Sequence, residues 1–324
     1  MERAAYITHE LKAKPFVKWV GGKGQLLSQL ENHLPKDLYH EDFTYIEPFV
    51  GGGAMLFFML QKFRNIKRVV INDINRNLTE AYINIKDNAE GLVYRLKHIE
   101  QQYSSISDYE EQRNYYLEMR RRFNEENLSS IDKTATLIFL NRTCFNGLYR
   151  ENSKGKFNVP FGRYTNPTIC NEDLIYADSE LLNKFDIEIM CGDFAETVSK
   201  IDNNRLNFFY FDPPYRPLSS TSSFNSYVKE TFDDDEQKRL ANFCKNISLK
   251  KNCLWMLSNA DCSSKNPEDL FFEEIYSKFE IQRVYASRSV NANASKRGKL
   301  PELLICNFMS EEEYKSNHLE LHYD

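Results

Sequence analysis

Four consecutive residues that follow the apolar run Phe208–Phe211 are best suited to chemistry: Asp212, Pro213, Pro214 and Tyr215. The apolar run is typical of a strand that is buried on both faces of a sheet. Because proline has no N–H to give a neighbouring strand, we expect the strand to end at Asp212. Open α/β sheets bind their ligands at the carboxyl ends of their strands. The sequence therefore predicts an acid, a rigid turn and an aromatic ring at a ligand-binding edge.

This motif suits the transfer of a group to an amino nitrogen on a flat ring. The Asp212 carboxylate and the Pro213 carbonyl can each accept a hydrogen bond from an –NH2 group. An amino nitrogen held in this way loses conjugation with its ring and becomes a better nucleophile, and Tyr215 offers a face on which the ring can stack. The simpler alternative is a strand that ends in a Pro-Pro turn with a solvated aspartate.

A second pattern fits the binding of a nucleoside. An extended segment, 44–50, leads into the glycines 51–53 and a helix, and the apolar strand 69–71 is followed by Asn72 and Asp73. In such a unit the glycine loop lets the backbone approach the ligand, and the acid binds the ribose hydroxyls. The loop lacks the GxGxxG pattern, so an adenosine cofactor without a pyrophosphate fits best. An ordinary βαβ unit with an incidental Asp73 is the alternative.

The turn Gly21-Gly22-Lys23 resembles a phosphate loop, but the wider pattern does not fit one. A P-loop requires glycine at position 17 and Ser or Thr at position 24, where this chain has Val17 and Gly24. ATP binding is therefore not expected. Trp19 could stack on a ligand and Lys23 could pair with a carboxylate, whereas a tight turn beside a core tryptophan is the alternative.

The stretch Asn141–Asn166 is locally basic and rich in aromatic residues. It holds five basic residues against one acidic residue, a local net charge of +4, and five aromatic residues are interleaved with them. Its turn signals, Asn146-Gly147 among them, predict hairpin loops. Basic loops with exposed rings suit a nucleic-acid duplex, because arginine pairs with phosphates and guanine edges and a ring can wedge between bases. A charged hairpin whose aromatic residues fold inward is the alternative.

Several further segments carry narrower predictions. Asp193 is either a helix N-cap or a partner for the adenine amino group of a cofactor. The polar loop 219–223 lies beside the catalytic edge and is predicted to act as a lid. The acids within 233–236 fit a helix capping box better than a metal site. The segment 283–299 is predicted to be a basic loop before the last strand, 303–308.

Length and composition bound the class of protein. The 324 residues suffice for one large α/β domain with an insertion, or for two domains. A hydrophobic content of 41% and a charged content of 27% are ordinary for a soluble globular protein, and the net charge of −5 means that any basic surface is local. We expect no secretory signal, no membrane segment, a cytoplasmic location and a monomer. The seven cysteines form no CxxC pair, which favours neither disulfides nor zinc.

Together these stretches resemble the DNA adenine-N6 methyltransferases of the Dam and DpnII type, in the α arrangement. In that arrangement the cofactor motif comes first, then the target-recognition domain, then DPPY. The matching stretches are KWVGGK, EPFVGGG, IND, NGLYR, KFNVPFGRY, FDPPY and SKRGKLPELL. They occur in the family's order from about Lys14 to Phe308, which covers nearly the whole chain.

The resemblance implies an α/β fold: a Rossmann-like methyltransferase sheet with an inserted, mainly helical target-recognition domain that carries a β-hairpin. Residues 1–74 and 186–324 would form the catalytic domain, and residues 75–185 the DNA-binding recognition domain. The implied cofactor is S-adenosyl-L-methionine, with S-adenosyl-L-homocysteine as product and no metal. The implied partner is double-stranded DNA of a bacterium or phage, and a restriction endonuclease encoded nearby is a further candidate.

The resemblance also implies roles for individual residues. The catalytic residues would be Asp212, Pro213, Pro214 and Tyr215. The expected cofactor contacts are Trp19, Lys23, Phe49, Gly51, Gly53, Asp73, Asp193 and Asp212. The expected DNA contacts are Lys18, Phe145, Asn146, Leu148, Arg150, Arg163, Tyr164 and Arg297. Phe145 would be the ring that inserts into the duplex, and the target adenine would leave the stack. The recognition stretch is most similar to members that recognise GATC.

Two other functions remain as alternatives. A methyltransferase that acts on RNA or on a protein glutamine amide usually has NPPY in place of DPPY and lacks the NGLYR…FNVPFGRY insertion, so Asp212 and that insertion favour DNA. A non-catalytic, sequence-specific DNA binder would have a decayed catalytic centre. The intact DPPY, the FVGGG loop and Asp73 argue against that alternative.

Overall fold

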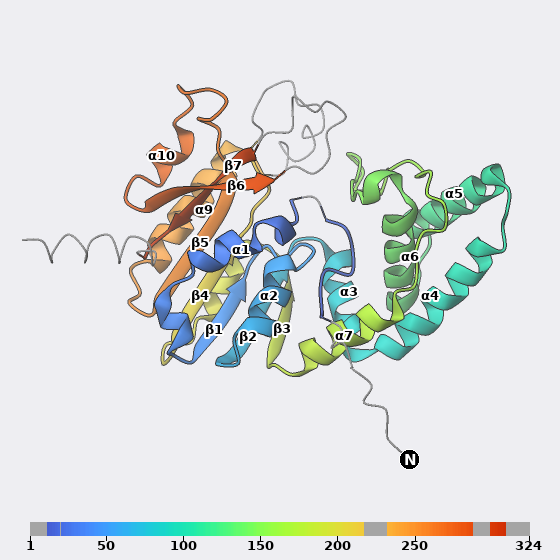
Figure 1. Ribbon diagram of the computed structural model, residues 1–324, viewed down its shortest axis with the longest axis horizontal. Helices are drawn as coiled ribbons and strands as arrows, with labels where there is room; N and C mark the ends of the chain where they lie inside the picture. Colours follow the sequence, from blue (N-terminus) through green and yellow to red (C-terminus); the bar gives the residue numbers. More distant parts are fainter. Residues whose placement is uncertain (1–11, 20, 217–231, 288–298, 309–324) are drawn as a thin grey trace, which may run out of the picture.

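The computed structural model describes residues 12–19, 21–216, 232–287 and 299–308. Within them a mixed sheet has the strand order β3-β2-β1-β4-β5-β7-β6 (Figure 1). Its strands are β1 (Phe43–Glu47), β2 (Ile66–Asp73), β3 (Ile187–Cys191), β4 (Leu206–Phe211), β5 (Cys253–Ala260), β6 (Glu280–Ser287) and β7 (Lys299–Cys306). The first five in this order pair in parallel, and β7 runs antiparallel to both β5 and β6. This arrangement confirms the predicted Rossmann-like α/β fold.

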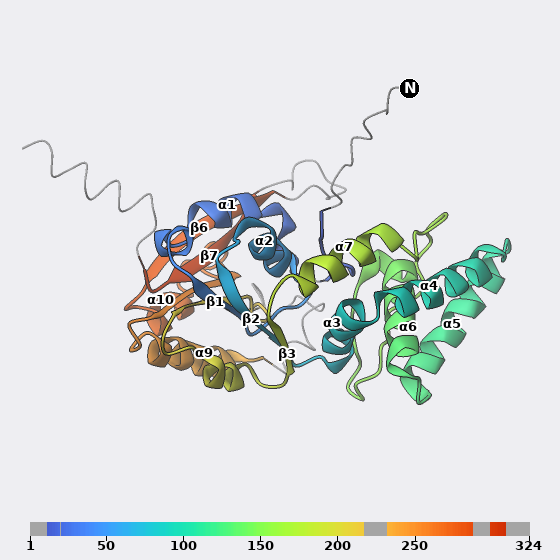
Figure 2. The same cartoon turned by 90° about the horizontal axis from the view of Figure 1, so that it is seen from below.

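Helices cover both faces of the sheet and extend beyond its β3 edge (Figures 1 and 2). On or beside the sheet are η1 (Lys23–Gln25), α1 (Leu27–Asn32), η2 (Lys36–Tyr39), α2 (Ala54–Lys62), η4 (Phe194–Lys200), α9 (Asp234–Ile247) and α10 (Phe271–Ile275). Beyond the edge are α3 (Arg76–Asp87), α4 (Ala89–Ser104), α5 (Tyr109–Glu125), α6 (Ser130–Thr143), η3 (Phe145–Gly147) and α7 (Glu172–Asn183).

The aromatic strand β4 shows how the core is divided by the sheet. Side chains alternate across a strand, so Phe208 and Tyr210 enter the core that α2 covers, and Phe209 and Phe211 enter the core under α9. All four are fully buried, and burial of each such ring stabilises the fold by about 1.5–3 kcal/mol. Figure 2 shows α2 and α9 on opposite faces of the sheet. The prediction of a strand buried on both faces is confirmed.

The helical part is built around α6. This helix packs against α3, α4 and α5, and its residues from Thr134 to Asn141 are all buried. The predicted β-hairpin follows it as an irregular loop with two single antiparallel bridges, Cys144 to Phe161 and Glu151 to Phe157. The backbone N–H of Asn158 donates to the Arg150 carbonyl at 3.0 Å and closes the inner turn.

The structure corrects the bounds of the basic loop predicted over 283–299, of which residues 288–298 lie outside the described residues. Arg283 lies within β6, where its guanidinium pairs with Asp261 at 2.8 Å and with Glu273 at 3.0 Å. Asp261 is 1% exposed, so its charge requires a cation close by. The last described strand also begins earlier than predicted, at Lys299. The predicted lid 219–223 and Arg297 lie outside the described residues. Among those described, no helix combines the length and apolar character needed to cross a membrane.

Candidate active site

Three carboxylates meet at the carboxyl edge of the parallel strands. Glu47 ends β1, Asp73 ends β2 and Asp212 directly follows β4. Since β1 lies between β2 and β4 and runs parallel to both, the three strand ends are adjacent. The sequence predicted Asp73 and Asp212 at this edge, and it did not predict a role for Glu47.

The side chain of Lys23 is the centre of the polar contacts around Asp212. Lys23 is 3% exposed, and its Nζ lies 2.9 Å from Asp212 Oδ1 and 3.4 Å from Glu302 Oε2. The same ammonium contacts the hydroxyl of Tyr215, which donates to Glu302 Oε2 at 2.6 Å. A buried lysine requires anionic partners, and here strands β4 and β7 supply them. Lys23 therefore fixes the Asp212 carboxylate and the Tyr215 ring relative to each other.

Burial and the neighbouring charges set the protonation of this edge. Burial raises the pKa of the Asp212 carboxyl above its ordinary value, and the Lys23 ammonium opposes that rise. Burial also raises the pKa of Glu47 well above its ordinary value, opposed by a hydrogen bond from Tyr45 at 2.7 Å and increased by Asp212 and Asp73. Of the three strand-end acids Glu47, Asp73 and Asp212, Asp212 is the one paired with Lys23, so it is the one best stabilised in its charged, accepting form.

The two prolines differ in what their carbonyl groups contact. The Pro214 carbonyl accepts a hydrogen bond of 3.0 Å from Nε2 of Gln237. Within the described part of the chain, the Pro213 carbonyl has no hydrogen-bond partner. Asp212 and Pro213 therefore present two acceptors next to each other, and Pro214 does not compete with them.

The glycine loop after β1 is held rigidly beside Asp73. The N–H of Gly51 donates to Asp73 Oδ2 at 3.0 Å, and its carbonyl accepts from the Tyr82 hydroxyl at 2.9 Å. Gly51 and Gly53 have φ values of +48° and +79°, which side-chain-bearing residues rarely adopt. A Cβ on Gly51 would also lie 2.9 Å from the Trp19 ring. The loop thus needs glycine both for its backbone and for the approach of Trp19.

The side chains around this loop are mostly aromatic or apolar. Trp19 stacks on Tyr149, with ring centroids 4.9 Å apart. Phe49 is half-buried and packs against Phe194 at 5.3 Å between centroids. Ile74, directly after Asp73, is 81% exposed, which is unusual for a large apolar residue at the end of a buried strand.

Asp193 adopts the first of its two predicted roles. Its carboxylate accepts from the Ala195 N–H at 2.9 Å and forms a capping box with Glu196. Arg239 also binds both carboxylate oxygens, at 2.9 Å and 2.6 Å, and it is the main cause that lowers the pKa of Asp193. A contact between Asp193 and a cofactor stays a prediction.

Several predicted DNA contacts gather around the buried side chain of Asn141. This amide accepts from the N–H of Lys18 at 2.8 Å and donates to the carbonyls of Lys18 and Gly147, at 2.9 Å each. It thereby joins the segment before η1 to the turn after α6. Phe145, 49% exposed, and Asn146, with φ +57°, lie on that turn. The Lys18 ammonium lies 5.4 Å from the centre of the Tyr164 ring.

The remaining predicted DNA contacts are more dispersed. Leu148 is half-buried and packs against the main core. Arg150 is exposed, and its Nε donates to Asn158 Oδ1 at 2.7 Å across the irregular hairpin. The guanidinium of Arg163 lies 5.8 Å from the centre of the Tyr109 ring. The irregular hairpin thus fixes Arg150 through Asn158.

Comparison with known proteins assigns the family. Residues 19–290 match the model of the D12 class N6 adenine-specific DNA methyltransferases. The chain belongs to this class. A type II methyltransferase of Methanocaldococcus jannaschii is 44% identical over 302 residues, which cover 92% of this chain and all of the relative. A DNA adenine methylase of Haemophilus influenzae is 32% identical over 295 residues, covering 91% of this chain and 94% of the relative.

The D12 class assignment confirms the predicted family and reaction type. The protein is an adenine-specific DNA methyltransferase, and the alternatives of an RNA or protein substrate and of a non-catalytic binder are not supported. Another similar protein, a type II methyltransferase of Lactococcus lactis subsp. cremoris, is 38% identical over 303 residues and covers 93% of this chain and 97% of its own length.

The catalytic edge of this D12 methyltransferase also holds residues that were not predicted from the sequence. Glu47 could have been found as an acid that directly follows an apolar stretch, as Asp73 and Asp212 were. Glu302 lies within SKRGKLPELL, a matching stretch, but nothing local indicates that it meets Lys23. For Gln237 and Ile74, no sequence pattern indicates a place at the site.

Proposed function

We propose that this methyltransferase transfers a methyl group from S-adenosylmethionine to the N6 amino group of adenine within GATC in duplex DNA, after the adenine has left the helix. The observation that carries the proposal is the paired acceptor of Asp212 and Pro213, held by Lys23 at the edge that also bears the glycine loop and Asp73. The GATC assignment rests on the similarity of the NGLYR and KFNVPFGRY stretches to members that recognise that site.

The residues around the glycine loop fit an adenosine-type cofactor. Asp73 lies where its carboxylate could accept from ribose hydroxyls, and the exposed Ile74 offers an apolar face to a purine. Trp19, Phe49, Gly51 and the other predicted cofactor contacts line the same edge. When bound there, S-adenosylmethionine supplies an activated methyl group. Metal is not part of the proposal, and we expect activity to persist in EDTA.

The chain's own residues prepare the amino group of the target. The Asp212 carboxylate and the Pro213 carbonyl each accept a hydrogen bond from one N–H of this amino group. The two hydrogen bonds hold the nitrogen lone pair out of conjugation with the ring. Lys23 keeps Asp212 charged and oriented, and Tyr215 provides a face for the flat base. These contacts lower the barrier by positioning the amino group and by hydrogen bonding to it.

We assign DNA recognition to residues 75–185, between catalytic segments 1–74 and 186–324. An adenine inside a duplex cannot reach Asp212, so it must leave the stack. The half-exposed Phe145 is suited to fill the gap, and Lys18 and Arg150 are suited to phosphate or base edges. We also propose that the enzyme acts on cytoplasmic DNA. A restriction endonuclease is proposed to accompany it, because two relatives are named type II methyltransferases.

Duplex oligonucleotides test this proposal. Purified protein with radiolabelled S-adenosylmethionine should label a GATC duplex and leave a GTTC duplex unlabelled. A duplex with 2-aminopurine in place of the target adenine should become more fluorescent on binding, and Phe145→Ala should reduce that rise. Equal labelling of both duplexes would reject GATC, and an unchanged fluorescence would reject the extrusion of the base.

A further inference from the structure

A buried pair of amide side chains forms hydrogen bonds with the backbone on both sides of Tyr215. On one side, Gln237 Nε2 donates to the Pro214 carbonyl at 3.0 Å. On the other side, the Arg216 N–H donates to Asn259 Oδ1 at 3.4 Å. Asn259 Nδ2 donates to Gln237 Oε1 at 3.2 Å and joins the two contacts. The amide pair therefore spans the peptide units that flank the tyrosine.

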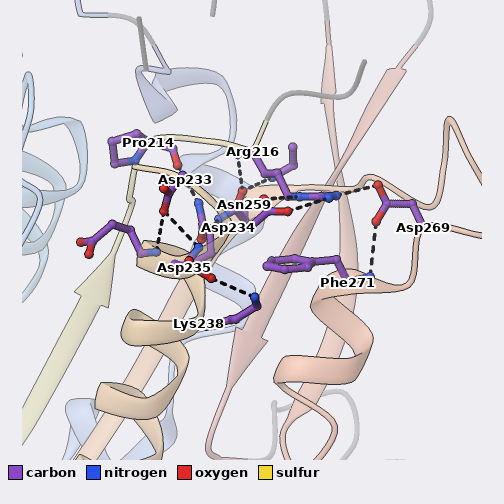
Figure 3. Close-up of polar contacts among 12 residues, drawn as sticks. Pro214, Arg216, Asp233, Asp234, Asp235, Lys238, Asn259, Asp269 and Phe271 are labelled. Carbon is purple, nitrogen blue, oxygen red and sulfur yellow. Dashed lines mark hydrogen bonds and ion pairs between the residues drawn. The ribbon is translucent and has the colours of Figure 1, made fainter. Parts of the chain in front are cut away.

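Both amides are well suited to hold that position. Gln237 and Asn259 are each 0% exposed, so water does not compete for their hydrogen bonds. Asn259 lies in β5, next to β4 in the sheet, and Gln237 lies in the first turn of α9. Asp233 caps that turn by accepting from the N–H groups of Asp235 and Glu236 at 3.0 Å each (Figure 3). Asp233 thus supplies the N-cap of the capping box predicted over 233–236, whereas the Glu236 carboxylate pairs with Arg239 at 2.6 Å.

The side chain of Arg216 adds an anchor directly after the tyrosine. Figure 3 shows its guanidinium between two acids and beside a ring. It binds Asp234 at 2.8 Å and 3.1 Å and Asp269 at 2.6 Å, and it lies 4.4 Å from the centre of the Phe271 ring. With two carboxylates on it, the Arg216 charge is neutralised locally. Its role here is to fix the chain where the DPPY turn ends.

We propose that Gln237 and Asn259 are positioning residues for methyl transfer, which decide that the Pro213 carbonyl, and not that of Pro214, receives the target amino group. Gln237 occupies the Pro214 carbonyl and so fixes the orientation of the peptide plane between Pro214 and Tyr215. That plane in turn sets the position of the Tyr215 Cα, from which the side chain and its ring extend. The inference rests on the proposed function of Asp212 to Tyr215, and it extends the site to α9 and β5.

The first test replaces Gln237 by methionine, which keeps the length of the side chain and removes its hydrogen bonds. We expect single-turnover methylation by Gln237→Met to slow by about 10- to 100-fold, as for a misplaced reacting group. The dissociation constants for S-adenosylmethionine and for duplex DNA should stay within a few-fold of those of the wild type. Leu240→Val, a change at a buried residue of the same helix that removes no hydrogen bond, is the matched control and should keep the wild-type rate.

A second variant supplies a readout that general destabilisation would not move. In Gln237→Glu, an ionised carboxylate cannot donate to the Pro214 carbonyl, whereas the protonated acid can. The rate of this variant relative to the wild type should therefore rise as the pH is lowered. A ratio that does not depend on pH would overturn the proposal, and this measurement decides the matter if Gln237→Met fails to fold.

The outcomes separate this inference from the proposed function. If Asp212→Ala is inactive while a folded Gln237→Met methylates at the wild-type rate, the positioning role is wrong and the catalytic edge stands. If Asp212→Ala is fully active, the proposed function itself fails. A slow Gln237→Met with an unaffected Leu240→Val supports the positioning role.

Discussion

Asp73 contacts two backbone groups of its own chain while it faces the expected cofactor edge. Its oxygens accept from Gly51 and Asn75 at 3.0 Å and 2.9 Å, so it closes the glycine loop. We predict that Asp73→Ala weakens S-adenosylmethionine binding by ~1.5–3 kcal/mol, the usual loss for a hydrogen bond to a charged group. Calorimetry measures this, with Asp42→Ala, an exposed acid distant from the loop, as control. Unchanged affinity in Asp73→Ala would remove Asp73 from the cofactor site.

Arg150 is the residue on which the expected site preference depends most. Its guanidinium is fixed on Asn158 and is exposed, so it can meet a guanine edge with a defined geometry. We predict that Arg150→Ala costs ~1–3 kcal/mol on the correct site and relaxes the choice of base at one guanine position. Lys154→Ala removes a charge from the same loop and serves as control.

Methylation profiles over a library of altered sites measure the effect of Arg150→Ala. Spread of methylation to sites changed at one guanine supports base recognition. A phosphate contact would instead weaken all sequences alike and reduce the salt dependence by about one unit of slope. Uniformly weaker methylation with the same site preference would thus contradict the prediction.

Some site residues could be predicted because a local pattern marks them. Asp73 and Asp212 each lie at the end of an apolar strand, and Lys23 follows a double glycine. Glu302 and Gln237 could not be predicted in this way, because they reach the site only through tertiary packing. Glu302 arrives when β7 pairs with β5 in register with Ala260, and Gln237 when α9 packs on the sheet.

At the scale of elements, several strands could be predicted from the sequence, whereas their order in the sheet was not predicted. Buried parallel strands such as β4 and β5 are nearly continuous apolar runs, which periodicity detects. The position of β7 between β5 and β6 was not predictable, since an antiparallel strand at that place depends on long-range pairing. The same pairing places Arg283 on the Asp261 carboxylate, where a loop had been expected.

Helix α7 carries a buried acid that makes stability depend on pH. Asp178 is fully buried, its Oδ1 accepts from the Lys14 N–H at 3.0 Å, and its Oδ2 has no partner among the described residues. Burial raises the pKa of Asp178 to about 8. The folded state therefore binds a proton that the unfolded state releases at about pH 4, and this stabilisation is lost as the pH rises through about 8.

We predict that Asp178→Asn raises the melting temperature at pH 8.5 and changes it little at pH 4. The amide keeps an acceptor for Lys14 and carries no charge, so the cost of burying an anion disappears. Each unit by which the pKa is raised corresponds to about 1.4 kcal/mol at high pH. Thermal unfolding at both pH values measures this, and equal shifts at the two values would show that Asp178 is not protonated in the fold.

At the scale of the whole molecule, the helical part and the sheet meet at the site. Asn141 of α6 binds the backbone of Lys18, and Tyr149 stacks on Trp19 beside the glycine loop. The expected DNA contacts are thereby joined to the expected cofactor contacts through packed side chains.

The most direct test of this account is the methylation of plasmid DNA in a strain that lacks adenine methylation, read by single-molecule sequencing. We predict N6-methyladenine at GATC with the wild-type protein, none with Asp212→Ala, and a partial signal with Asp212→Asn, which keeps one acceptor oxygen. Asp212→Ala should still fold and bind DNA. Full methylation by Asp212→Ala, or no methylated adenine with the wild type, would contradict the assignment of the catalytic edge.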